Sequence, residues 1–178
     1  LFQLLGMFTG NALIVMAWVD RQVSMPALLR NWTTVWIGNL AGALLIAAAF
    51  SQTSLITGGF GTTAAKIAAG KMALAPLDIF VRAILCNALV CLAVWLSFAA
   101  TDVAGKILAI ILPVAAFVAL GLEHSIANMF LLPLGLMAGA EGSAALAAQN
   151  IAIATAGNIL GGAGGVALAY RFAFKPQV

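Results

Sequence analysis

The feature that most constrains the fold is an apolar run from Ile107 to Met137, interrupted near its middle by a short polar segment. The run is 31 residues long, whereas roughly 20 helical residues cross the hydrocarbon core of a bilayer. Gly121 and the polar residues that follow it therefore predict a break in the helix. Backbone groups released by a break at membrane depth must be buried in protein or line a water-filled cavity, so the break is the first place to expect a functional site.

The interrupting segment holds His124, the only histidine of the chain, and Glu123, one of five acidic residues. Ionisable side chains are costly inside a membrane and generally mark a pathway or a paired site. An imidazole changes its charge near physiological pH and both donates and accepts hydrogen bonds. A histidine in an apolar stretch can also be purely structural, and the residues alone leave both interpretations open. We expect Glu123 to be structural, bonding a helix end or a neighbouring segment.

The composition defines the class of protein. The chain of 178 residues is 64% hydrophobic and 7% charged, whereas soluble domains carry about 25% charged residues. It is therefore predicted to be a polytopic α-helical membrane protein, and its net charge of +3 does not indicate nucleic acid. Cys86 and Cys91 are five positions apart in one span and are expected to be free and buried. No metal or cofactor site is predicted.

Five apolar spans are predicted along the chain: residues 1–19, 32–50, 75–100, 107–137 and 145–172. The Gly/Asn cluster from Gly6 to Asn11 predicts a second break, inside the first span. Residues 20–30, with Pro26, are interpreted as a polar turn, and residues 51–71 as a long connection. The chain begins without Met inside an apolar run, so we expect a single transmembrane domain over residues 1–178 that is truncated at its N-terminus.

An internal repeat relates the second span to the last. Four residues recur at a constant offset of 119 positions: Asn31, Gly38, Asn39 and Gly42 recur as Asn150, Gly157, Asn158 and Gly161. The segments around the two predicted breaks also correspond. The third span then needs a partner ahead of residue 1, which predicts six spans in two inverted halves of three. Broken helices at matching positions of inverted halves point to a central binding site.

The distribution of basic residues predicts the orientation. Five lie on one face of the predicted topology, in turns and the C-terminal tail: Arg21, Arg30, Lys106, Arg171 and Lys175. The other face has Lys66 and Lys71, with Arg82 just inside the third span, where Asp78 at i−4 is expected to pair with it. The more basic face, and with it the C-terminus, is therefore predicted to be cytoplasmic.

Several motifs together resemble the formate/nitrite transporter family. They are Gly121–Met129, Asn31-Trp32 with Gly38-Asn39 and Gly42, Leu85-Cys86-Asn87 with Cys91–Trp95, and Gly157-Asn158. The similarity extends over essentially the whole chain and is greatest to the formate channels. Family members usually carry an acidic residue just before the Leu-Phe-Thr of the broken second helix, whereas this chain reads Gly6-Met7-Phe8-Thr9.

The resemblance implies an all-α, aquaporin-like protomer of two inverted three-helix repeats, with broken second and fifth helices and the first helix missing from this sequence. It further implies a homopentamer with one pore per subunit, in a bacterial or archaeal plasma membrane. The implied function is a passive or proton-coupled channel for small monovalent anions, formate first and nitrite second, with acetate as a further ligand. Hydrosulfide or another short monocarboxylate is the alternative within the family. Neither a cofactor nor an enzymatic activity is expected.

The resemblance also implies the positions of pore residues. His124 would lie at mid-pore with Thr9 opposite it, and Lys71, Asn87 and Asn158 would belong to the nearby polar set. The hydrophobic constrictions would be formed by Phe117 on the periplasmic side and by Phe8 and Met7 on the cytoplasmic side. A proton-donating histidine could neutralise a bound anion, because a neutral acid crosses an apolar constriction more cheaply than its anion.

Each of these residues also has a structural interpretation. Thr9 could cap the following half-helix, Lys71 could be an interfacial lysine that extends to water, and the asparagines could bond between helices. Asn39 is assigned to packing. Gly161-Gly162 and Gly164-Gly165 are expected to offer small faces for contact between subunits.

The residues also bear on two other classes of function. An intramembrane serine protease using Ser125 and His124 is disfavoured, because neighbouring residues on one backbone rarely reach nucleophile–base geometry. A neutral-solute channel of the aquaporin or ammonium type is disfavoured because the sequence has no paired Asn-Pro-Ala and only one histidine.

Overall fold

The computed structural model describes residues 8–174, which are helical apart from turns and short non-helical linkers such as residues 122–124. The longer helices are α2 (Met25–Ser51), α3 (Gly59–Met72), α4 (Pro76–Ala99), α5 (Val103–Ala119), α6 (Ser125–Met137) and α7 (Ala144–Ile159). The shorter elements are η2 (Gly10–Ile14), α1 (Val15–Val19), η3 (Ser54–Thr57), the π-helical η4 (Leu160–Leu168) and α8 (Ala169–Ala173). Met7 and Lys175 lie outside the described residues.

Within residues 8–174, three apolar helices are long enough to cross a membrane: Met25–Ser51, Pro76–Ala99, and the continuous run Ala144–Ala173 formed by α7, η4 and α8. The apolar helices α5 and α6 are shorter and are separated by a non-helical linker. The predicted break is thus confirmed: α5 ends at Ala119, Gly121 takes a left-handed φ of 63°, and α6 begins at Ser125. Glycine reaches positive φ without the steric cost of a Cβ.

The other predicted break falls at the edge of the described chain. Phe8 and Thr9 form a turn, and helical structure begins at Gly10. The described residues thus contain the second half of the broken first span, η2 and α1, with Thr9 at its entrance.

The sequence interpretation was wrong at two connections. The polar turn predicted for residues 20–30 is shorter, because α2 already begins at Met25, where Ser24 accepts a hydrogen bond from Ala27 N and Pro26 occupies the first turn. The connection predicted for residues 51–71 contains helix α3, despite its glycines. Its small residues Ala64 and Ala68 are buried against α6, so tertiary packing outweighs the low helix propensity of glycine.

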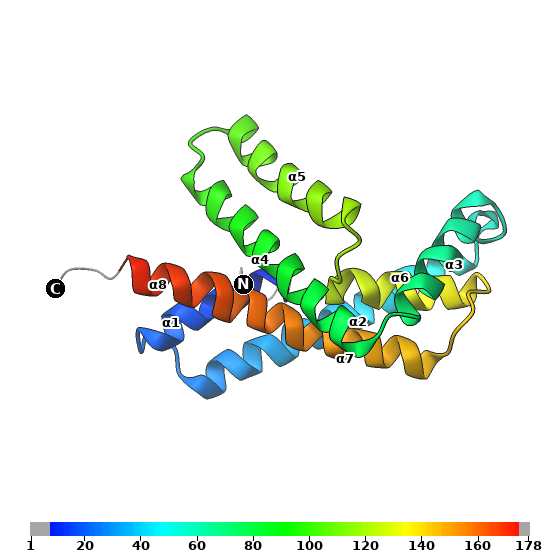
Figure 1. Ribbon diagram of the computed structural model, residues 1–178, viewed down its shortest axis with the longest axis horizontal. Helices are drawn as coiled ribbons and strands as arrows, with labels where there is room; N and C mark the ends of the chain where they lie inside the picture. Colours follow the sequence, from blue (N-terminus) through cyan, green and yellow to red (C-terminus); the bar gives the residue numbers. More distant parts are fainter. Residues whose placement is uncertain (1–7, 175–178) are drawn as a thin grey trace.

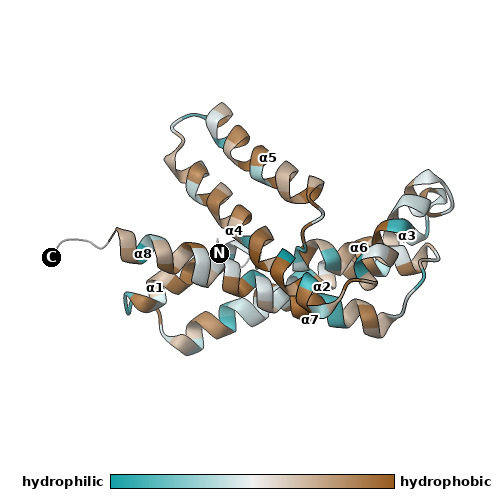
Figure 2. Cartoon of the chain, viewed as in Figure 1, coloured by the Kyte–Doolittle hydropathy of each residue, from teal (hydrophilic) through white to brown (hydrophobic). Residues whose placement is uncertain are grey.

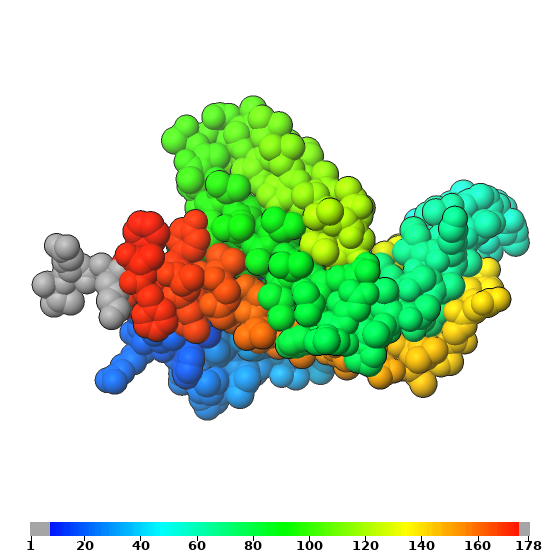
Figure 3. Space-filling view, viewed as in Figure 1, coloured from blue at the N-terminus to red at the C-terminus, as the bar shows by residue number. Residues whose placement is uncertain are grey.

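The helices form a layered bundle around the long run of α7, η4 and α8 (Figure 1). α1 and α2 lie along one side of this run, and α4 crosses and packs against it. α4 and α5 form a hairpin that projects from the bundle. α3 and α6 pack together at the end of the bundle opposite to α8. The space-filling view shows a hollow between the hairpin and α3 (Figure 3).

Hydrophobicity follows this arrangement (Figure 2). α5 is apolar nearly throughout and has no buried residue, because it packs mainly along α4. Hydrophilic residues gather instead where α4, α6 and α2 come close together. The polar interior is therefore concentrated at the break between α5 and α6, and the apolar surface of α5 is left for lipid or for another protein surface.

Close packing of the last span on α4 depends on glycine. A Cβ at Gly157 or Gly161 would overlap backbone atoms of α4, at Phe80 or Ile84, and one at Gly162 would overlap Asn87. Gly161 and Gly162 are buried inside the subunit, so the expectation that they form a contact face between subunits was wrong. Gly165 alone of the four is exposed.

The helices preserve the internal repeat in their contacts. Trp36 of α2 donates its indole N–H to the hydroxyl of Thr155 on α7, at 3.1 Å, and these two positions are 119 residues apart. This is the offset of the repeat, so a residue contacts its own counterpart. Counterparts related by a two-fold rotation meet only on the rotation axis, which therefore passes between α2 and α7 at this hydrogen bond.

Candidate functional site

Two buried asparagines hold the backbone on both sides of the site. Asn158 accepts from Ser125 N at 2.8 Å and donates to the carbonyls of Glu123 and Ala83, at 3.0 and 2.8 Å. Asn87 donates to the carbonyl of Thr9 at 3.2 Å and to that of Asn158 at 2.6 Å. The free backbone groups of the break are thus satisfied by side chains of α4 and α7, as membrane burial requires.

His124 joins the two broken spans. It is buried, and its Nε2 lies 3.2 Å from the hydroxyl of Thr9, 115 residues earlier. Its Nδ1 accepts a hydrogen bond from Ala127 N at 3.2 Å, so the ring caps the N-terminus of α6. A nitrogen that accepts a backbone N–H carries no proton, so in this arrangement the imidazole is neutral and Nε2–H donates to Thr9.

An aromatic side chain covers the histidine. The ring of Phe117, on the last turn of α5, stacks on the imidazole with centroids 5.5 Å apart and planes 18° apart. Phe8 is buried on the opposite half and meets Trp32 of α2 edge to face, at 6.2 Å. Phe117 therefore covers the His124–Thr9 contact on the α5 side, whereas Phe8, next to Thr9 in the chain, packs on Trp32. The structure does not describe Met7 beside Phe8.

Glu123 is the centre of a second polar cluster next to the histidine. Its carboxylate is fully buried and forms an ion pair with Lys71 Nζ at 2.7 Å. The other carboxylate oxygen accepts from Asn128 at 2.6 Å and from Asn150 at 3.2 Å. Asn150 also donates to the carbonyl of Lys71, and Asn128 donates to the amide oxygen of Asn150. Helices α3, α6 and α7 are thus linked to the break by one network.

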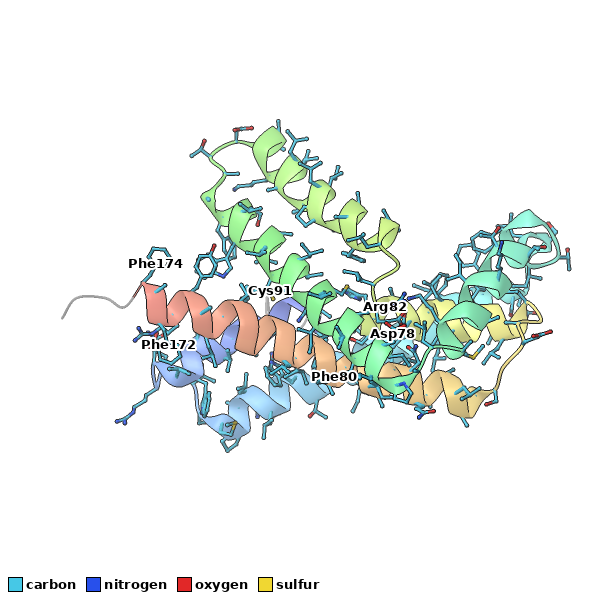
Figure 4. The ribbon with its side chains drawn as sticks, in the orientation of Figure 1. Asp78, Phe80, Arg82, Cys91, Phe172 and Phe174 are labelled. Atoms are coloured by element: carbon cyan, nitrogen blue, oxygen red, sulfur yellow. The ribbon has the colours of Figure 1, made fainter. Side chains whose placement is uncertain are left out.

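A further ion pair supports the same linker from α4. Arg82 Nε donates to Asp78 at 2.7 Å, as predicted from their i, i+4 spacing, and Arg82 Nη1 reaches the carbonyl of Gly121 at 3.4 Å. Figure 4 labels both residues on α4 near the foot of the projecting hairpin. Lys71 and Arg82 are therefore each paired with a carboxylate, so the four charges beside the break cancel.

Thr9 lines a cavity of about 520 Å³ between η2 and the C-terminal half of α4. Its other walls are mostly apolar, with Val90, Val94 and Phe98 contributed by α4. Thr9 and Asn11 are its polar lining residues, and His124, which bonds Thr9, does not line it. A small polar solute in the cavity could bond to Thr9, and Thr9 links the cavity to His124.

The structure brings most of the predicted pore residues together. His124 touches Thr9 and Phe117, Asn87 touches Thr9, and Asn158 holds the histidine loop. Lys71 reaches the loop through Glu123 and the carbonyl of Leu122. Phe8 packs on Trp32, with no described contact to His124. Asn39 donates to Val35 O within its own helix, consistent with a packing role.

Sequence reasoning missed two members of the network, Asn128 and Asn150. Asn128 stands within the motif Gly121–Met129, and Asn150 is the repeat counterpart of Asn31. In the first half Asn11 donates to Asn31 at 3.1 Å, and in the second Asn128 donates to Asn150 at 2.7 Å. The repeat therefore contained the signal: an asparagine after each break, bonded to an asparagine of the following long helix.

These features define a class: a polytopic helical membrane protein in which inverted halves bring two interrupted helices to one buried polar site. Comparison with known proteins makes the assignment specific. The sequence model described as Formate/nitrite transporter matches residues 3–172. The chain belongs to the formate/nitrite transporter family.

Individual relatives agree with this assignment. The chain is 40% identical over 188 residues to a protein named "Probable formate transporter" from Methanothermobacter thermautotrophicus, covering 96% of this chain and 69% of the relative. A solved structure titled "FNT family ion channel" superposes with a TM-score of 0.85 at 30% identity, over 94% of this chain and 69% of that one. Another solved structure, titled "Pentameric formate channel with formate bound", superposes with a TM-score of 0.72 at 35% identity, over 85% of this chain and 68% of that one. The fold is therefore that of the family, with the inverted repeats and the broken fifth helix predicted from the sequence.

Proposed function

We propose that this chain forms a transmembrane pathway for small monovalent anions, with formate as its first substrate and nitrite as its second. The observation that carries the proposal is the hydrogen bond between His124 and Thr9, which joins two interrupted spans beside the stacked ring of Phe117. Membership of the family and likeness to a formate channel with formate bound support the choice of substrate. A pairing of proton-bearing imidazole and hydroxyl suits a small carboxylate, whose oxygens only accept hydrogen bonds.

The hydrogen bonds of His124 define how a proton reaches the anion. Nε2–H already points to Thr9, so an anion at Thr9 can accept that hydrogen bond from the neutral ring. Adding a proton at Nδ1 requires the bond from Ala127 N to open, which couples charging of the ring to the first turn of α6. The imidazolium can then give its Nε2 proton to the carboxylate; loss of the Nδ1 proton and capture of one at Nε2 restore the starting state.

Neutralisation would lower the cost of leaving the site. A bare charge pays a large desolvation penalty against apolar walls, whereas the neutral acid pays only that of a polar group. We assign Phe117 to the constriction on the side of the α5–α6 break, and Phe8 with Met7 to the opposite one. Asn87 and Asn158 position the two loops, and Lys71 contributes to the anion pathway as an ammonium held by Glu123.

The environment of the proposed channel follows from its exposed surface. The apolar faces of α2, α4 and α5 would face lipid or neighbouring subunits in a homopentamer, the assembly named for one solved relative. We place the protein in the plasma membrane of a bacterium or archaeon, with the C-terminus in the cytoplasm. Arg21, in the turn before α2, and Arg30 and Lys106, near the N-terminal ends of α2 and α5, lie on the same face as α8. Arg171 pairs with Asp20 there, and Trp95 stacks on Tyr170.

The local geometry disfavours proteolysis. Both ring nitrogens of His124 are engaged, by Thr9 and by Ala127, and Ser125 Oγ has no hydrogen-bond partner among residues 8–174. The neighbouring serine and histidine therefore do not form a nucleophile–base pair.

Flux into proteoliposomes tests the function. Vesicles containing the purified protein should take up formate, and more slowly nitrite and acetate, at rates that rise as the medium is acidified. Glycerol and ammonia, each in matched vesicles, should enter no faster than through protein-free vesicles. Fast glycerol or ammonia entry without formate uptake would contradict the anion pathway, and hydrosulfide uptake exceeding that of formate would assign a different substrate of the same class.

A further inference from the structure

Another cavity lies apart from His124, at the membrane face where α4 and α8 end. It has a volume of about 330 Å³ and is lined by Met16, Trp95, Tyr170, Arg171 and Phe174. Trp95 stacks on Tyr170 with centroids 4.8 Å apart, and Tyr170 stacks on Phe174 at 5.7 Å. The walls of this cavity, which we call the aromatic pocket, are therefore mainly flat apolar rings.

Two of the residues that line the aromatic pocket each have a donor without a partner. Trp95 Nε1 and Arg171 Nη1 are both buried without a hydrogen-bond partner among the described residues. Both groups are donors only, and buried donors are nearly always satisfied. Arg171 Nε pairs with Asp20, which orients the guanidinium but leaves Nη1 unused. Among the described residues, those that line the pocket have two unused donors and no unused acceptor, which favours a ligand that accepts hydrogen bonds.

The position of the pocket identifies the kind of ligand. Trp95 lies in the last turns of α4 and Arg171 in α8, at the end of the last span. Trp and Tyr at the ends of spans are typical of the membrane interface, and basic pockets between spans bind the head groups of anionic lipids. The same face carries the basic residues Arg21, Arg30 and Lys106. The pocket is much larger than a formate ion, and its apolar walls suit a glycerol backbone and the start of acyl chains.

We propose that the aromatic pocket binds an anionic phospholipid, whose phosphate accepts hydrogen bonds from Trp95 Nε1 and Arg171 Nη1. The phosphodiester supplies the acceptor oxygens, and an arginine fork matches its geometry. The lipid would bridge the first broken span, through Met16, to the third and last spans. This site is separate from the anion pathway, and its existence does not depend on which solute the protein carries.

Lipid binding to the purified protein tests the site. Phosphatidylglycerol is titrated into the detergent-solubilised protein, and binding is followed by native mass spectrometry and by the rise in melting temperature. Phosphatidylcholine with the same acyl chains and water-soluble glycerol 3-phosphate serve as separate probes. We expect phosphatidylglycerol to bind and stabilise, phosphatidylcholine to bind more weakly, and glycerol 3-phosphate to have no effect.

Two variants remove one donor each. Trp95→Phe keeps a ring against Tyr170, and Arg171→Lys keeps the charge beside Asp20. Because a hydrogen bond to a charged group contributes about 1.5–3 kcal/mol, each should weaken phosphatidylglycerol binding by about tenfold or more. Trp18→Phe, on the same face but outside the pocket lining, is the matched control and should bind as the parent does.

Three results would overturn the proposal. Trp95→Phe and Arg171→Lys could bind phosphatidylglycerol as tightly as Trp18→Phe does. Phosphatidylcholine could bind as tightly as phosphatidylglycerol, which would indicate general lipid contact. Glycerol 3-phosphate could compete for the pocket at equal affinity, which would indicate a site for a soluble phosphate.

Discussion

The two halves of the repeat share a scaffold and differ in chemistry. In each, a break is followed by an asparagine that bonds to an asparagine of the next long helix: Asn11 to Asn31, and Asn128 to Asn150. The first half adds only neutral groups to its break, the hydroxyl of Thr9 and the ring of Phe8. The second half adds a carboxylate and an imidazole at adjacent positions, Glu123 and His124.

The inverted fold is therefore separable from the ionisable groups that the second half adds to it. The asparagine pair is what both halves need to bury an interrupted helix, since each break releases backbone groups that must be satisfied. The ionisable residues exist only on one side and are held by additional contacts from α3 and α7. The site is therefore asymmetric although the scaffold is not, and substitutions at equivalent positions should have unequal effects.

The largest stability effect is expected at Glu123, which has no ionisable counterpart in the first half. Glu123→Gln keeps the shape but leaves the Lys71 ammonium, 15% exposed, without its partner. Removing one member of a buried ion pair costs about 3 kcal/mol or more, so the melting temperature in detergent should fall steeply. The control Glu141→Gln, at an exposed turn, should change stability by less than about 0.5 kcal/mol.

A compensating substitution sharpens that result. Lys71→Met combined with Glu123→Gln removes both charges, so the double variant should be more stable than Glu123→Gln alone. Equal destabilisation in the single and double variants would show that the ion pair is not what Glu123 contributes.

An intermediate effect is expected from the equivalent asparagines. Asn128→Ala removes a bond to a carboxylate and should cost about 2 kcal/mol, whereas Asn11→Ala removes a bond between neutral amides and should cost about 1 kcal/mol. Chemical or thermal unfolding of the two variants side by side measures the difference. Equal losses, or a larger loss at Asn11, would contradict the asymmetry of the halves.

The smallest effect is expected on the axis between the halves. Trp36→Phe and Thr155→Val each remove one partner of a single neutral hydrogen bond and should cost about 1 kcal/mol. Because they share that bond, the double variant should lose less than the sum of the single losses. Strict additivity would show that the two counterparts do not contact each other.

The sequence predicted the parts of this arrangement that depend on local pattern. The length of the run from Ile107 to Met137 required a break, Gly121 marked it, and the spacing of Asp78 and Arg82 predicted their ion pair. The offset of 119 positions shared by four residue pairs, Asn39 and Asn158 among them, predicted the repeat.

What the sequence did not predict depends on partners far along the chain. Helix α3 forms because Ala64 and Ala68 pack against α6, and no pattern within residues 51–71 indicates this packing. Asn150 contributes to the site through Glu123, 27 residues away, so its role becomes visible only when the helices are packed. Gly161 and Gly162 show a different limit. Small residues indicate a close helix contact, but the sequence does not indicate whether the contacting helix belongs to the same subunit.

The central claim, that His124 governs anion passage through its charge and proton, is tested most directly by formate flux in proteoliposomes between about pH 5 and pH 8. His124→Phe roughly keeps the ring volume and the stack on Phe117, so the protein should fold but lose pH-dependent formate uptake. His124→Asn should retain hydrogen bonding to Thr9 yet give an altered flux that no longer changes with pH. Formate uptake by His124→Phe at the parental rate and with the parental pH profile would contradict the claim and leave the histidine a structural residue.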